Sequence, residues 1–220
     1  MVFNDDILFI HIGKTGGTSA ADYLCRTLSA PVYNAIPERA HGKAIGHEIT
    51  VQGQRHGTLE EAQQFIKKYD KTIDSFKEIV AVIRHPYNLE ISLFNYYKRL
   101  IAKQPKILDN APKRKEIVLN GSFEDFVRGK FYHRHGLNIR KYITIDDKIP
   151  KNVRIVKFEN LHEEFTEIGR RYGNGNPDFP HLNKTKKVDI EKYITPELEL
   201  IIFRKYRWVF EVGDYKRLEF

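Results

Sequence analysis

The chain has 220 residues, enough for one sizeable hydrophobic core, and we expect a single domain over residues 1–220. Hydrophobic residues make up 41% of the chain and aromatic residues 12%, which argues against intrinsic disorder. Lys and Arg number 37 against 29 Asp and Glu, a formal net charge of +8. This excess favours an anionic partner or substrate: nucleic acid, a nucleotide, an acidic glycan or a membrane surface.

The single cysteine, Cys25, excludes an internal disulfide, and the helical pattern around it indicates a buried thiol. The N-terminus "MVFNDDILFI" is not a signal sequence, and no apolar run approaches the roughly 20 residues of a membrane span. We therefore expect a soluble, cytoplasmic protein without a membrane span. The sequence is also compatible with a native anchor or signal that has been removed.

The first half of the chain begins with a strand, a turn and a helix. The continuous apolar run at 7–12, "ILFIHI", is typical of a strand buried on both faces in a parallel sheet. Helical spacing follows from Thr18 to Leu28. Residues 30–57 show no sustained period and predict an irregular region, after which Thr58 and Glu61 have capping-box spacing and mark a helix start.

The second half repeats this order. A buried strand is predicted at 78–84 and a helix follows Pro86, whereas the polar stretch 102–116 predicts an exposed excursion. A third strand at 153–161 runs into another helix, and 195–210 reads as a helix with Thr195 as its cap. Three strands that each lead into a helix predict an α/β sandwich with a mostly parallel sheet, whose ligands sit at the carboxyl ends of the strands.

The turn between the first strand and its helix has the composition of an anion site. A helix N-terminus presents unpaired N–H groups and the positive end of the helix dipole. Gly16 and Gly17 permit close approach, Lys14 adds charge, and three side chains add hydroxyl groups: Thr15, Thr18 and Ser19. We expect a phosphate here. The strict Walker A pattern would need a glycine at position 8, which is Leu8, so "GKT" does not mark an ordinary NTPase.

A second candidate anion site follows the second strand. Arg84 stands at the strand end and can bind a phosphate with two hydrogen bonds. Ser92 lies about two turns into the next helix, and its hydroxyl group can donate a hydrogen bond. Two such turns on neighbouring strands predict a ligand with two separated phosphates.

These motifs resemble the PAPS-dependent sulfotransferase family, in particular the carbohydrate O-sulfotransferase branch. "HIGKTGGTS" (11–19) resembles the family's 5′-phosphosulfate loop, and "RHPYNLEIS" (84–92) resembles its 3′-phosphate motif. "VKFENL" (156–161) and "PHLNKTKK" (180–187) are similar to later segments, the second being a loop that closes over the nucleotide. The sequence departs from the family at His85, where an acidic residue or Asn is common, and at Asn88 to Glu90, where a further Arg often stands.

The resemblance implies a P-loop, nucleotide-kinase-like three-layer fold that binds 3′-phosphoadenosine 5′-phosphosulfate (PAPS). Its sulfonate would pass in line to a hydroxyl of a carbohydrate-like acceptor and leave 3′,5′-ADP, without a metal. Lys14 is expected to neutralise charge on the leaving oxygen. The expected nucleotide-binding residues are Lys14, Thr15, Gly16, Gly17, Thr18, Ser19, Arg84, Ser92 and Lys186.

The acceptor hydroxyl must lose a proton, for which a histidine is suited near neutral pH. The candidates in the irregular region are His41, His47, His56 and, as an acidic option, Glu48. The segment "RHGTLEEAQQFI" resembles one in bacterial and polysaccharide sulfotransferases and favours His56, with His47 as the runner-up. His11, on the first strand, is expected to shape the turn.

Two other functions are compatible with the sequence. An ATP-dependent kinase or NTPase is suggested by "GKT" after a strand. A noncatalytic polyanion-binding module is suggested by two basic groups, which comprise Lys98, Arg99, Lys103, Lys106, Lys113, Arg114 and Lys115, and His133, Arg134, His135, Arg140 and Lys141. No nucleic-acid-binding module surrounds these groups, so we expect no nucleic-acid partner. The pattern leaves the acceptor and the oligomeric state open.

Overall fold

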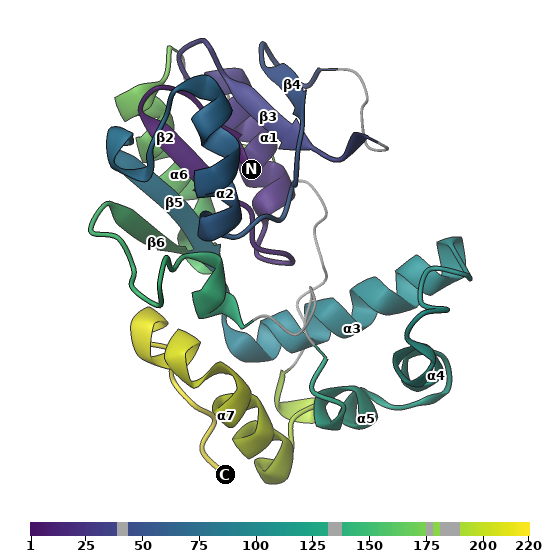
Figure 1. The fold of residues 1–220 in the computed structure, drawn as a ribbon. Helices are drawn as coiled ribbons and strands as arrows, with labels where there is room; N and C mark the ends of the chain where they lie inside the picture. Colours follow the sequence, from purple (N-terminus) through teal and green to yellow (C-terminus); the bar gives the residue numbers. More distant parts are fainter. Residues whose placement is uncertain (39–43, 132–137, 175–177, 181–189) are drawn as a thin grey trace. The chain divides into compact units, whose positions relative to one another are not determined.

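The computed structural model describes residues 1–38, 44–131, 138–174, 178–180 and 190–220 (Figure 1). The chain divides into two compact units. The first, here the sheet unit, comprises Met1–Ile83 and Ile139–Lys184, and the second, the helical unit, comprises Arg84–Asn138 and Thr185–Phe220. The expectation of one domain over the whole chain stays a prediction.

Six strands form one sheet in the order β4-β3-β1-β2-β5-β6 (Figure 1). Their bounds are β1 (Val2–Phe3), β2 (Ile7–Ile10), β3 (Tyr33–Ile36), β4 (Ile49–Gln52), β5 (Glu78–Ile83) and β6 (Val153–Lys157). The pairs β2–β5, β5–β6 and β3–β4 are parallel, and β1 is antiparallel to β2 and β3. The predicted mostly parallel sheet is confirmed, with the three strands read from the sequence adjacent to one another.

The sequence prediction of an irregular region at 30–57 is wrong in part, because β3 and β4 lie within it. Each has only four residues, "YNAI" and "ITVQ", too few to show a period along the chain. What makes them strands is pairing: Phe3 is opposite Tyr33, and Tyr33 is opposite Ile49. These partners are far apart in sequence, so local pattern could not reveal them.

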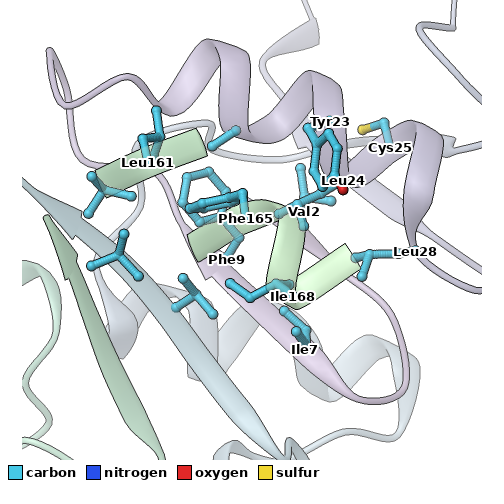
Figure 2. Packing of buried hydrophobic residues seen from close by; sticks show 14 of the residues in the cluster. Val2, Ile7, Phe9, Tyr23, Leu24, Cys25, Leu28, Leu161, Phe165 and Ile168 are labelled. Atoms are coloured by element: carbon cyan, nitrogen blue, oxygen red, sulfur yellow. The ribbon is translucent and has the colours of Figure 1, made fainter. Parts of the chain in front are cut away.

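The sheet has helices on both faces, which makes three layers. On one face α1 (Gly17–Thr27) and α6 (Leu161–Tyr172) pack on β2 and β5. Figure 2 shows Tyr23 and Leu24 of α1 and Phe165 and Ile168 of α6 gathered over Phe9 of β2, all fully buried. Each such side chain contributes about 1.5–3 kcal/mol by leaving water, so this core fixes α1 on the sheet.

The opposite face carries an aromatic cluster under α2 (Leu59–Ile66). Phe3 of β1 stacks on Tyr33 at 5.0 Å between ring centroids and meets Phe65, Tyr69 and Phe76 edge-on. The predicted capping box of α2 is confirmed: the Glu61 N–H donates to Thr58 Oγ1, and the Thr58 N–H donates to Glu61 Oε2. Short 3-10 turns follow at Lys67–Tyr69, Ile73–Ser75, Ile139–Tyr142 and Phe158–Asn160.

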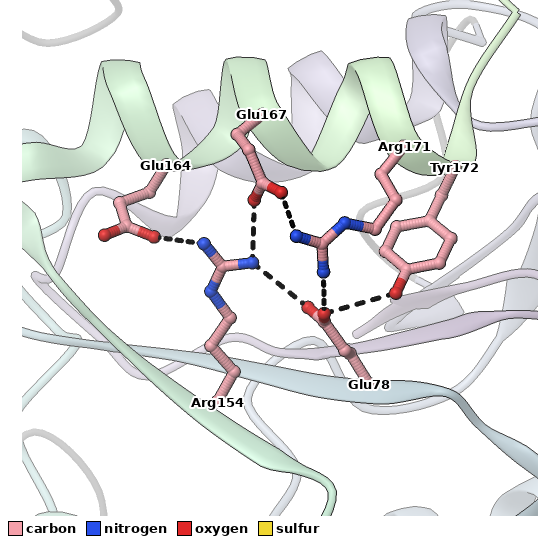
Figure 3. A network of polar contacts seen from close by, with 6 residues as sticks. All are labelled: Glu78, Arg154, Glu164, Glu167, Arg171 and Tyr172. Atoms are coloured by element: carbon pink, nitrogen blue, oxygen red, sulfur yellow. Dashed lines mark hydrogen bonds and ion pairs between the residues drawn. The ribbon is translucent and has the colours of Figure 1, made fainter.

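An ion-pair network ties α6 to β5 and β6 (Figure 3). Arg154 of β6 donates to Glu78 of β5 at 3.3 Å and to Glu164 and Glu167 of α6 at 2.6 and 2.8 Å. Arg171 of α6 also pairs with Glu78. One half-buried guanidinium therefore pairs with three carboxylates from two other elements.

The helical unit contains α3 (Pro86–Lys103), α4 (Pro112–Asn120), α5 (Phe123–Arg128), the turn Ile190–Lys192 and α7 (Pro196–Gly213). The predicted cap of α7 is confirmed by the Leu198 N–H, which donates to Thr195 Oγ1. The exposed excursion expected at 102–116 contains the start of α4. Pro112 is compatible with this helix, because it occupies the first turn, where a proline is tolerated. No helix in the described ranges is both long enough and apolar enough to cross a membrane.

Candidate functional site

The predicted anion-binding turn lies where β2 ends and α1 begins. Its last residue, Gly16, is the N-cap of α1 and has a φ of 82°, in the left-handed region that favours glycine. Lys14 is also left-handed, with a φ of 68°. Because Gly16 has no side chain, no N-cap oxygen competes with a ligand for the first N–H groups of α1.

Both glycines of the turn are required by close packing. A Cβ at Gly17 would lie 2.0 Å from Cδ2 and 2.3 Å from Nε2 of His11. A Cβ at Gly16 would lie 2.7 Å from Leu161 Cδ2 and 2.9 Å from the Phe158 ring. The turn is therefore held from both sides, by the His11 imidazole and by the start of α6.

The four predicted side chains of the turn divide by exposure. Thr15 is fully buried and its hydroxyl donates to the Ile12 carbonyl at 2.9 Å, so its hydroxyl proton is already used within the turn. Ser19 is buried on α1, whereas Lys14 is half-buried and Thr18 is exposed. Lys14 and Thr18 are thus the side chains of this group that a ligand reaches most readily.

His56 lies against the turn. Its Nδ1 is 2.9 Å from the His11 carbonyl oxygen, and the two imidazole rings meet at 4.4 Å between centroids. A carbonyl oxygen can only accept, so Nδ1 carries the proton in this hydrogen bond. In the neutral ring Nε2 then holds the lone pair, which is the tautomer that a general base at Nε2 needs.

The alternative bases are engaged elsewhere in the sheet unit. His47 Nε2 is 2.8 Å from the Leu28 carbonyl oxygen, at the end of α1. Glu48 is 7% exposed, and its carboxylate accepts from the N–H groups of Ile45 and Gly46 at 2.9 and 2.8 Å. Both side chains hold the 45–48 segment in place. His41 lies outside the described residues.

The second predicted turn begins directly after β5, which pairs in parallel with β2 through Ile10 and Ala81. Arg84 is half-buried, and Ser92 is buried on α3. The His85 ring packs 4.9 Å from Tyr87 and 4.8 Å from Tyr215, between ring centroids. The predicted ligand Lys186 lies outside the described residues.

A cavity of about 60 Å³ in the sheet unit adjoins the glycine turn. It lies at the face of α1 that meets the sheet and is lined by Met1, Val2, Phe9, His11, Thr18, Ala21, Asn34, Ile45 and Arg55. Asn34 and Arg55 are not among the residues that the sequence motifs predict for the site. The only local signal was that Arg55 directly precedes His56, since Asn34 reaches the cavity through the pairing of β3 with β1.

In the described ranges no cluster of three or more His, Cys, Asp or Glu side chains could hold a metal ion. No protein-family model matches the chain, and no curated protein matches it.

Two solved structures resemble the chain weakly. A sulfotransferase from Alicyclobacillus acidocaldarius is 12% identical with a TM-score of 0.47, over 97% of each chain. The mouse sulfotransferase SULT7A1, complexed with PAP, is 16% identical with a TM-score of 0.46, over 96% of this chain and 88% of its own. At these identities and scores neither neighbour defines the family or the chemistry of this chain.

Proposed function

We propose that this protein transfers the sulfonate group of PAPS to an acceptor hydroxyl, with a carbohydrate-like compound as the acceptor. The observation that carries the proposal is the hydrogen bond between His56 Nδ1 and the His11 carbonyl. It holds an imidazole beside a strand-to-helix turn whose composition suits a phosphate. The motif at 11–19 supports the same reading through its resemblance to a 5′-phosphosulfate loop.

Different residues of the chain have different roles in an in-line transfer. The N–H groups at the start of α1 hold the 5′-phosphosulfate, and Lys14 neutralises the charge that builds on the phosphate oxygen as its bond to sulfur breaks. His56 Nε2 takes the proton of the acceptor hydroxyl while that oxygen bonds to sulfur. Arg84 and Ser92 remain the predicted ligands of the 3′-phosphate, and Lys186 remains a predicted nucleotide-binding residue.

Ligand-dependent thermal stability tests the nucleotide assignment. At a concentration about 100 times its dissociation constant, 3′,5′-ADP should stabilise the protein by about 2.7 kcal/mol, a rise of roughly 5–10 °C at 2–4 °C per kcal/mol. Lys14→Ala should reduce this rise, whereas Lys151→Ala, which removes an exposed charge from the same unit, should not. Stabilisation by ATP with magnesium alone would identify a kinase or NTPase instead.

Activity then tests the base. His56→Gln should lower sulfonate transfer by about 10²–10⁴-fold with little change in affinity for 3′,5′-ADP. His47→Gln is the matched control, because its ring serves the loop rather than the turn. If labelled sulfonate never leaves PAPS for any acceptor in a broad panel while polyanions bind tightly, the protein is a binding module and the proposal is wrong.

A further inference from the structure

The cavity beside the glycine turn combines apolar walls with four polar side chains, those of His11, Thr18, Asn34 and Arg55. Val2, Phe9 and Ala21 supply part of the apolar lining. Thr18, Asn34 and Arg55 supply a hydroxyl, an amide and a guanidinium. All of these residues belong to the sheet unit, so the cavity is defined within one compact body.

Two of the polar side chains have unused bonding capacity. Asn34 is 7% exposed, and its side-chain amide makes no hydrogen bond with another described residue. The Arg55 guanidinium is half-buried and has neither a hydrogen bond nor a carboxylate partner in the described ranges. A buried amide and a cation that share a cavity and have no partner among the described residues indicate a place for a ligand that accepts hydrogen bonds and carries negative charge.

The backbone around Arg55 is fixed on both sides. The Gly53 N–H donates to the Ile36 carbonyl at 2.9 Å, which continues the pairing of β3 with β4. On the other side His56 is bound to the His11 carbonyl. Arg55 therefore lies between two anchored residues and next to the proposed base, which limits how far its side chain can move from that base.

The volume of the cavity restricts what it can hold. A cavity of about 150 Å³ binds a benzene ring, so by proportion about 60 Å³ suits a group of roughly three heavy atoms rather than a sugar ring. A carboxylate has that size, is planar, and can accept two parallel bonds from a guanidinium. A sulfate has five heavy atoms and fits the volume less well.

We propose that this cavity is a subsite for a carboxylate carried by the acceptor, with Arg55, Asn34 and Thr18 as its polar contacts. The inference rests on the proposed function and narrows its acceptor to a hydroxyl compound with a carboxylate, such as a uronic acid. Arg55 acts as a specificity residue: it selects the charged acceptor while His56, the next residue, takes the proton.

The test measures binding of glucuronic acid to protein saturated with 3′,5′-ADP, by calorimetry, with glucose as the uncharged comparison. Wild-type protein should bind glucuronic acid at least tenfold more tightly than glucose. Arg55→Gln, which keeps hydrogen bonding but removes the charge, should abolish this preference. Lys151→Ala should keep it, since Lys151 is exposed and does not line the cavity. Lactate, in place of glucuronic acid, distinguishes a small hydroxy acid from a sugar acid.

The outcomes separate this inference from the proposed function. If 3′,5′-ADP binds but glucuronic acid and lactate show no dependence on Arg55, the carboxylate subsite is wrong and the nucleotide assignment stands. If Arg55→Gln instead weakens 3′,5′-ADP tenfold, Arg55 serves the nucleotide and the subsite is again wrong. If 3′,5′-ADP does not bind, but glucuronic acid or lactate still binds to wild-type protein and not to Arg55→Gln, the subsite stands without the proposed function.

Discussion

Replacing Gly17 by alanine tests whether the packing of His11 shapes the turn. The added Cβ would lie 2.0 Å from the His11 ring, whereas carbon atoms in contact are normally about 3.5–4.0 Å apart. The ring would have to move by roughly 1 Å or more, and it is already packed against His56 and Phe9. Overpacking of this kind costs about 1–3 kcal/mol, or roughly 2–12 °C in Tm at 2–4 °C per kcal/mol.

Gly57→Ala is the matched control. Its Cβ would meet the flexible end of the Met1 side chain at 3.1 Å and Glu61 Oε2 at 3.6 Å, contacts that small adjustments relieve. Thermal unfolding should place Gly57→Ala within about 2 °C of wild type, since a change of about 0.5 kcal/mol corresponds to that shift. Gly17→Ala should also weaken binding of 3′,5′-ADP. Equal Tm values for the two variants, with unchanged affinity, would refute the packing argument.

Two further predictions concern the sheet unit. Burial raises the pKa of the buried Cys25 thiol, and the charges of Glu48 and Asp22 add to the effect. Iodoacetamide at pH 8 should therefore label Cys25 only after the protein is unfolded in guanidinium. Rapid labelling of the folded protein would show that α1 is not packed as described. Arg154→Met should cost about 2 kcal/mol, or roughly 4–8 °C in Tm, because three carboxylates lose their shared cation. Arg207→Met, which breaks an exposed pair on α7, should change Tm by less than half as much, and similar losses in both variants would contradict the role given to the network.

The choice of base shows how far sequence reasoning could reach. The pattern offered His41, His47, His56 and Glu48 as alternatives, and resemblance alone favoured His56. Three of the four are described, and they differ in what they bind: His56 contacts the His11 carbonyl, whereas His47 and Glu48 hold the loop at 45–48. These partners are up to 45 residues away, so no local spacing could separate the candidates.

The sequence by itself determined the features that arise between neighbouring residues. These features depend on contiguous side chains and on backbone preference. They are the segments that form β2, β5 and β6, the caps Thr58 and Thr195, and the glycine turn before α1. Only the tertiary structure decided which distant segments meet. β3 pairs with both β1 and β4, and Asn34 and Arg55 reach one cavity because these pairings bring them beside α1. Such contacts depend on the cooperative burial of segments that are distant in the sequence, so a local residue pattern does not predict them.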